Sequence, residues 1–214
     1  MSANKCRSFA FLAVLLVFAS DVAFAQVPIV SPPAVDEKSC RNCGSAELLK
    51  GWILAGSAPQ DYRHGLKSDT TSPQKYAYIA SMADAAGAGF GTAMQTISAE
   101  NYRSERVRFS AVLRPHDVAS GAGLWLRVDG AAGKVLAFDN MQSRPVLGTE
   151  AWKRYEVVLD VPESAQALAF GVLLIGRGAL DFYELHFDKV GKDVPTTDLM
   201  ALPKAPVNLE LKQG

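Results

Sequence analysis

The sequence has little cysteine and no excess of charge. Its 214 residues include 3 Cys, and 22 Lys and Arg are balanced by 22 Asp and Glu. So few Cys exclude a small scaffold held together by disulfides. A net charge of zero disfavours a general nucleic-acid-binding protein, which needs a basic surface to displace counterions. The remaining composition, 49% hydrophobic and 21% charged, is that of a folded globular protein.

Sequence motifs of catalysis are also missing. The 3 His form no H-E-x-x-H pattern, and there is no G-x-S-x-G nucleophile elbow or D-x-D-x-D-G calcium loop. The glycine-rich stretch at 87–91 leads into a β-type run, so no helix N-terminus is expected there to bind phosphate. We therefore expect a non-enzymatic protein with no cofactor and no metal. A hydrolase with carboxylates far apart in the sequence is an alternative.

The N-terminus has the layout of a secretory signal peptide. Lys5 and Arg7 precede an uncharged apolar run at 9–19, and the small-x-small pattern of Ala23-Phe24-Ala25 follows. The run is shorter than the roughly 18 residues that a membrane-spanning helix needs. We expect cleavage after residue 25, a periplasmic or secreted protein, and no membrane contact afterwards.

Cys40 and Cys43 form a C-x-x-C pair in the segment expected to remain after cleavage. Such a pair can be a redox site, half of a zinc site or a local disulfide. Zinc would need further ligands, and a redox pair is expected between a strand and a helix, whereas this one follows a Pro-rich stretch. In an oxidising compartment, the expectation is a local disulfide that stiffens the entrance to the domain.

The rest of the chain divides into a linker, a body and a tail. Residues 26–50 are a Pro-rich linker with the Cys pair, 51–191 the folded body, and 192–214 an extended tail, pinned through the alternating Val207, Leu209 and Leu211. Inside the body, apolar residues recur with period two. The predicted strands lie at 75–82, 90–97, 106–114, 122–129, 154–160, 168–175 and 182–187, with a short helix at 98–102. This pattern predicts an all-β fold, a single antiparallel β-sandwich of jelly-roll type.

The polar faces of two predicted strands suggest a binding site. Trp125 lies between Leu124 and Leu126, so strict alternation points its ring away from the core. An aromatic ring can stack on a sugar, and arginine and carboxylate groups can bind its hydroxyls. We expect Trp125 as the stacking platform, with polar contacts from Arg127, Asp139, Asn140, Arg144 and, more weakly, Arg108. The alternative is structural: a covered Trp125, with Arg127 paired to an acid such as Glu156 or Asp160.

The body resembles a known type of bacterial domain. The residues that carry the resemblance are Gly89-Phe-Gly-Thr92, Gln95, Tyr102-Arg103, 106–110, 123–130, 138–141, Arg144-Pro145, Gly148-Thr149, Trp152, 158–162 and Phe170-Gly171. They are similar to galactose-binding-like or carbohydrate-binding-module-like β-sandwiches that accompany exported S41-type peptidases and some AraC-type regulators. Where that family has a tryptophan in its last strand, this chain has the sequence LDFYE at 180–184. The resemblance implies a non-catalytic module.

These observations lead to one functional expectation and two alternatives. We expect an exported binding module for a carbohydrate, a cell-envelope component or a similar polar ligand, with no nucleic-acid partner. The first alternative is an envelope structural or protein-interaction domain, and the second is the hydrolase. An accessible Trp125 would favour ligand binding, whereas a buried Trp125 with a paired Arg127 would favour the structural role.

Overall fold

The structure, a computed structural model, describes residues 50–69 and 72–201. The predicted signal peptide, both cysteines of the pair and the alternating residues at 207–211 lie outside that part. The strands within it are β1 (Ile53–Gly56), β2 (Tyr62–Asp69), β3 (Ser72–Ser81), β4 (Phe90–Ser98), β5 (Arg106–His116), β6 (Val118–Asp129), β7 (Val135–Asp139), β8 (Val146–Gly148), β9 (Lys153–Asp160), β10 (Ala167–Ile175) and β11 (Ala179–Val190). Single 3₁₀ turns occupy Pro59–Asp61, Glu100–Tyr102 and Ala131–Gly133.

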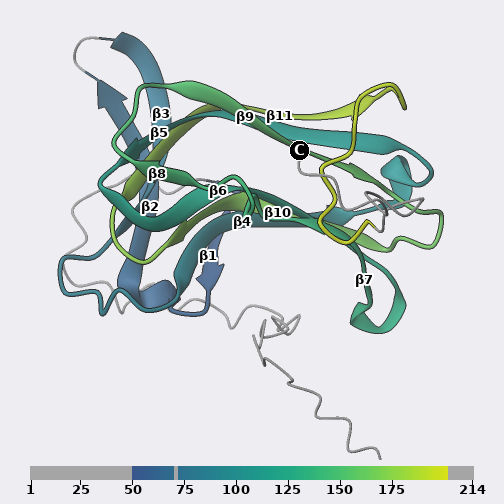
Figure 1. The fold of residues 1–214 in the computed structure, drawn as a ribbon, viewed down its shortest axis with the longest axis horizontal. Coiled ribbons are helices and arrows are strands. Elements are labelled where there is room, and N and C mark those ends of the chain that lie inside the picture. The colour runs from purple at the N-terminus through teal and green to yellow at the C-terminus, as the bar shows by residue number, and fades with distance from the viewer. Residues whose placement is uncertain (1–49, 70–71, 202–214) are drawn as a thin grey trace, which may run out of the picture. The chain divides into compact units, whose positions relative to one another are not determined.

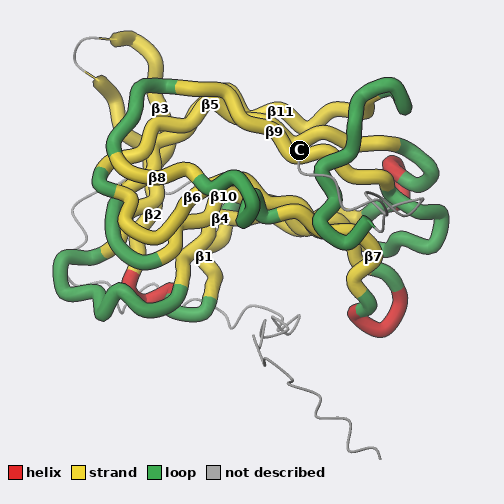
Figure 2. Tube along the Cα trace, in the orientation of Figure 1, coloured by secondary structure: helices red, strands yellow, loops and turns green. Residues whose placement is uncertain are grey.

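The strands form two antiparallel sheets that pack against each other (Figures 1 and 2). Sheet A has the order β1-β4-β10-β6-β7, with β8 also paired to β6, and sheet B has the order β2-β3-β11-β5-β9. Sequential strands thus often lie in different sheets, which brings residues far apart in the chain onto one face. The predicted all-β sandwich is confirmed.

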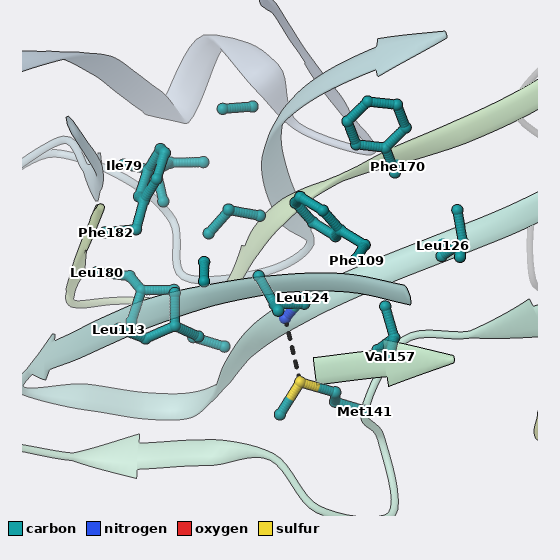
Figure 3. Packing of buried hydrophobic residues seen from close by; sticks show 14 of the residues in the cluster. Ile79, Phe109, Leu113, Leu124, Leu126, Met141, Val157, Phe170, Leu180 and Phe182 are labelled. Carbon is teal, nitrogen blue, oxygen red and sulfur yellow. Dashed lines mark hydrogen bonds between the residues drawn. The ribbon is translucent and has the colours of Figure 1, made fainter. Parts of the chain in front are cut away.

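Alternating apolar residues fill the space between the sheets. Val107, Phe109, Ala111 and Leu113 of β5 are all buried, and they face the equally buried apolar residues of β6 and β10. Figure 3 shows Phe109 among these side chains. The ring centroids of Phe109 and Phe170 are 5.1 Å apart. Each large apolar side chain buried in this way contributes roughly 1.5–3 kcal/mol. The core is therefore the main stabilising element of the sandwich.

Four strands are absent from the set that periodicity predicted: β1, β2, β7 and β8. Of these, β1, β2 and β7 lie at the edges of their sheets. The sequence of β2, YRHGLKSD, carries only two strongly apolar residues, so its hydrophobic signal is weak. Its first residue, Tyr62, is buried, and its hydroxyl donates to the carbonyl of Gly176 at 2.9 Å. The ring lies against Gly91, where an added Cβ would come within 2.4 Å of it. Part of the glycine-rich stretch therefore makes room for a core tyrosine.

The segment after β11 covers one free edge of each sheet. Thr197 donates its amide to the carbonyl of Val158 in β9 at 2.8 Å, and its hydroxyl accepts the amide of Val158 at 2.9 Å. Leu199 donates its amide to the carbonyl of Phe138 in β7 at 2.9 Å. Figure 1 shows this segment in yellow. Since β9 and β7 are edge strands, these bonds satisfy backbone groups that would otherwise be open for pairing. Residues 192–201 of the predicted tail are thus packed onto the sandwich.

Candidate functional site

Trp125 lies on the outer face of sheet A, as alternation predicted, but its side chain is covered. The residue is only 8% exposed and packs against Met94, Phe138, Ala169 and Leu173 of the same sheet. Its indole N–H donates to the hydroxyl of Thr92 at 2.7 Å. The ring therefore has no open face on which a sugar could stack, and the geometry does not support the predicted platform.

Arg127 follows on the same outer face and is paired. Its Nη2 donates to Oδ2 of Asp129 at 3.0 Å, and its Nε lies 2.8 Å from Oδ1. Asp129 is 4% exposed. The partner is thus neither Glu156 nor Asp160, the acids proposed from the sequence, because both belong to β9 in the other sheet. A covered Trp125 with a paired Arg127 meets the condition stated above for a structural role.

Asp139 and Arg144 form a second internal pair. Asp139 is fully buried, and Arg144 reaches both carboxylate oxygens, with Nη2 at 2.6 Å and Nη1 at 3.2 Å. The carboxylate also accepts the amide of Met141 at 2.8 Å. The side chain of Asn140 accepts the amide of Gln142 at 3.2 Å. These bonds fix the turn after β7, and Arg144 also donates to the carbonyl of Glu156 in β9 at 3.1 Å. Asp139, Asn140 and Arg144, all predicted to contact ligand, thus make internal hydrogen bonds.

Arg108, the weakest of the predicted contacts, lies in an open pocket on the outer face of sheet B. The pocket has a volume of about 300 Å³, and its lining comes from β5, β9 and β11: Arg108, Ser110, Arg154, Glu156, His186 and Asp188. The guanidinium of Arg108 lies between two carboxylates, 3.8 Å from Glu156 and 3.7 Å from Asp188. Both distances are too long for hydrogen bonds. Its side chain is 35% exposed, so N–H groups remain available to a ligand.

A second cluster on the same face surrounds a buried carboxylate that the sequence did not single out. Asp181 of β11 is 1% exposed. Three basic side chains converge on it: Nη2 of Arg114 at 2.9 Å, Nε2 of His116 at 2.8 Å and Nζ of Lys67 at 3.3 Å. We call these four residues the Asp181 cluster. They come from β2, β5 and β11, and only the pairing of these strands brings them together.

Aromatic rings border the Asp181 cluster. The guanidinium of Arg114 lies 4.3 Å from the ring centroid of Trp152. Trp152 makes edge-to-face contacts with Tyr183 at 4.8 Å and with Tyr76 at 5.6 Å. These three rings are half-buried. The outer face of sheet B thus combines aromatic side chains, charged groups and a pocket, which is the chemistry that had been predicted for Trp125 on the other sheet.

A third charged group fixes the end of the sandwich. Arg106 holds Asp160 with Nε to Oδ1 at 3.0 Å and Nη2 to Oδ2 at 2.9 Å. These bonds, with a smaller contribution from Lys192, lower the pKa of Asp160 from 3.8 to about 2. Arg106 also donates to the carbonyls of Lys192 and Val194, so the pair anchors the segment that covers the sheet edges.

Metal-ion clusters and membrane-spanning helices are both missing from the described residues. Across 50–69 and 72–201, no three His, Cys, Asp or Glu side chains gather closely enough to hold a metal ion. No helix in that part of the chain is long and apolar enough to cross a membrane.

Comparison with known proteins gives one relative by sequence and a set of similar folds. No protein-family model matches the sequence. Over 169 residues the chain is 38% identical to an uncharacterised HTH-type transcriptional regulator, YbfP, of Bacillus subtilis (strain 168). The match covers 77% of this chain, and the chain spans 57% of that relative's length.

Among solved structures, similar folds include a carbohydrate-binding module and two other proteins. The CBM22-1 xylan-binding domain of Xyn10C from Paenibacillus barcinonensis is 10% identical, with a TM-score of 0.48 over 67% of this chain and 88% of that domain. The tailspike protein 4 of bacteriophage CBA120 is 11% identical, with a TM-score of 0.49 over 66% and 20%. A cyclase from Fischerella sp. TAU is 14% identical, with a TM-score of 0.47 over 67% and 86%. Likeness at this level does not say what this chain binds.

Proposed function

We propose that this protein is an exported, non-catalytic recognition domain that binds a carbohydrate or a similar polar ligand on the outer face of sheet B. The observation that carries the proposal is Arg108. Its guanidinium is a third exposed in a pocket of about 300 Å³, and it forms no hydrogen bond within the described part of the chain. Arginine N–H groups in such a position suit the paired hydroxyl oxygens of a sugar.

The other pocket residues add complementary groups. The carboxylates of Glu156 and Asp188 are about half exposed and can accept hydrogen bonds from sugar hydroxyls. The hydroxyl of Ser110 can donate or accept at the base of the pocket, where the residue is 4% exposed. A ligand rich in hydroxyl groups would satisfy both the hydrogen-bond donors and the hydrogen-bond acceptors of the pocket.

A binding assay tests this proposal. A glycan array probed with the folded protein identifies a bound glycan, and calorimetry then measures its affinity for the wild type and for Arg108→Gln. We expect a loss of about tenfold or more in the variant, since a hydrogen bond to a charged group contributes about 1.5–3 kcal/mol. The control is Lys134→Gln, whose exposed side chain follows β6 in the other sheet. Equal affinity in a folded Arg108→Gln variant would contradict the proposal.

One observation favours a structural or protein-interaction domain instead. Five of the six residues predicted to bind ligand make internal hydrogen bonds: Trp125, Arg127, Asp139, Asn140 and Arg144. If the protein is such a structural or protein-interaction domain, the glycan array should detect no bound glycan. The hydrolase alternative is tested with the same glycans, because product formation by wild-type protein would show catalysis.

The sequence relative suggests a second use for the same site. The identity to an HTH-type regulator is consistent with a sandwich that senses a ligand as part of a transcriptional regulator. Cell fractionation with N-terminal sequencing separates the two ideas. Export predicts a processed protein beginning at Gln26 outside the cytoplasm, whereas cytoplasmic protein that retains Met1 would favour the regulator.

A further inference from the structure

The Asp181 cluster carries more positive than negative charge. Lys67 and Arg114 are cationic at neutral pH and share one carboxylate, which leaves one unit of positive charge with His116 neutral and two units with it protonated. One buried carboxylate needs charge compensation, but a single well-placed arginine supplies it. The second cation therefore exceeds what the burial of Asp181 requires.

The excess charge faces solvent. The side chain of Asp181 is 2% exposed, whereas those of Lys67, His116 and Arg114 are 42%, 41% and 25% exposed. A ligand approaching this face meets the cations before it meets the carboxylate. The exposed groups of the Asp181 cluster are therefore its basic side chains, although the chain as a whole carries no net charge.

The cations are also held in place by aromatic rings. Lys67 Nζ lies 4.4 Å from the ring centroid of Tyr78, and Arg114 lies 4.3 Å from that of Trp152. Cation–π contacts of this kind stabilise by about 0.5–1 kcal/mol at exposed sites. Both side chains are therefore positioned before a ligand arrives, which lowers the entropy cost of binding.

The cluster continues the pocket of Arg108 along one strand. Arg108, Ser110, Arg114 and His116 project from the same face of β5, and at about 3.3 Å per residue Ser110 and Arg114 lie about 13 Å apart. Arg154, which lines the pocket, stands on β9 opposite Val112, between the two regions. An extended ligand can contact both regions at once.

We propose that the Asp181 cluster binds an anionic substituent of the ligand, such as a uronate carboxylate, so that the preferred ligand is an acidic glycan. This inference depends on the proposed function and specifies the class of its ligand. Lys67 and Arg114 contact the anion, Asp181 holds them in position, and Trp152 borders the subsite.

The test compares polymers that differ only in charge. Affinity electrophoresis measures retardation by polygalacturonate against its methyl ester, and by dextran sulfate against dextran. We expect stronger binding of the charged member in at least one pair, and the pair that responds shows whether carboxylate or sulfate is preferred. Equal retardation by both members of both pairs, with a neutral glycan still bound on the array, would overturn this inference and leave the proposed function intact. Failure to bind any glycan would overturn both.

Lys67→Gln tests the cluster directly, because Asp181 keeps Arg114 and His116 as partners and the protein should stay folded. We expect this variant to lose about tenfold in affinity for the charged polymer, the equivalent of one charge-assisted hydrogen bond. Its affinity for a neutral glycan should not change. Lys134→Gln, in the connection between β6 and β7, should behave as wild type with both. Unchanged binding of the charged polymer by Lys67→Gln would contradict the inference.

Discussion

Replacing Trp125 separates a structural role from a ligand-binding one. The indole is 8% exposed, so truncation in Trp125→Ala removes nearly all of its packing against Met94, Phe138 and Leu173. Substitutions of buried tryptophan by alanine typically cost 3–5 kcal/mol. We expect about 3 kcal/mol here, at the low end, because the ring packs on an outer sheet face where water can partly fill the gap.

Trp125→Phe keeps an aromatic ring but removes the hydrogen bond and part of the packing. The indole N–H bond to Thr92 is lost, but the threonine hydroxyl still donates to the carbonyl of Val172 at 3.0 Å. No buried donor loses its partner, but the smaller ring fills less of the space, so the combined destabilisation should be about 1–2 kcal/mol. Trp125→Phe should therefore be destabilised clearly less than Trp125→Ala.

Urea unfolding followed by far-UV circular dichroism measures both variants, since this signal does not depend on the substituted ring. In thermal unfolding, a destabilisation of about 3 kcal/mol corresponds to a fall of roughly 6–12 °C in Tm for a protein of this size. Glycan affinity of Trp125→Phe should match the wild type. A Trp125→Ala variant within 1 kcal/mol of wild type, or a stable Trp125→Phe variant that no longer binds, would refute the structural reading.

Three further predictions concern stability. Arg144→Met should lower the free energy of unfolding by about 2–3 kcal/mol, measured with urea, because the fully buried Asp139 loses its cation. The loss is smaller than for a completely buried pair, since the Arg144 side chain is partly exposed. A loss below about 0.5 kcal/mol would contradict this prediction. The lowered pKa of Asp160 means that its ion pair stabilises the fold above about pH 4 and less as pH falls towards 2. Arg106→Met should therefore be less stable than wild type at pH 6, with a gap that narrows in acid; a gap independent of pH would count against the assignment. Gly91→Ala should destabilise the protein by about 1–3 kcal/mol in thermal unfolding, because the added Cβ would collide with the ring of Tyr62. An unchanged Tm would show that this ring can move aside.

Periodicity was sufficient for much of the fold. The alternation of Val107, Phe109, Ala111 and Leu113 identified the buried face of β5, because side chains on a strand alternate strictly between its two faces. The outward direction of Trp125 followed from the same rule. Its burial did not, since the residues that cover it come from neighbouring strands whose register is set by the folded sheet.

The candidate site was harder to predict for a related reason. Arg108 could be proposed from its own strand, but Lys67 and Asp181 are 114 residues apart and become neighbours only through β3. Trp152 contacts Arg114 from the segment before β9, and no local motif marks it. Sites built across a sandwich face depend on strand order, and strand order was not determined by the period-two pattern.

The most direct test of a ligand site on sheet B uses the indole N–H signals of the 3 tryptophans. Titration of ¹⁵N-labelled protein with the best glycan from the array, followed by heteronuclear NMR, should shift the Trp152 indole and the amides around Arg108 and Ser110. The Trp125 indole, bonded to Thr92 on the opposite sheet, should stay in place. Shifts confined to Trp125 and its neighbours, with sheet B unchanged, would contradict the account.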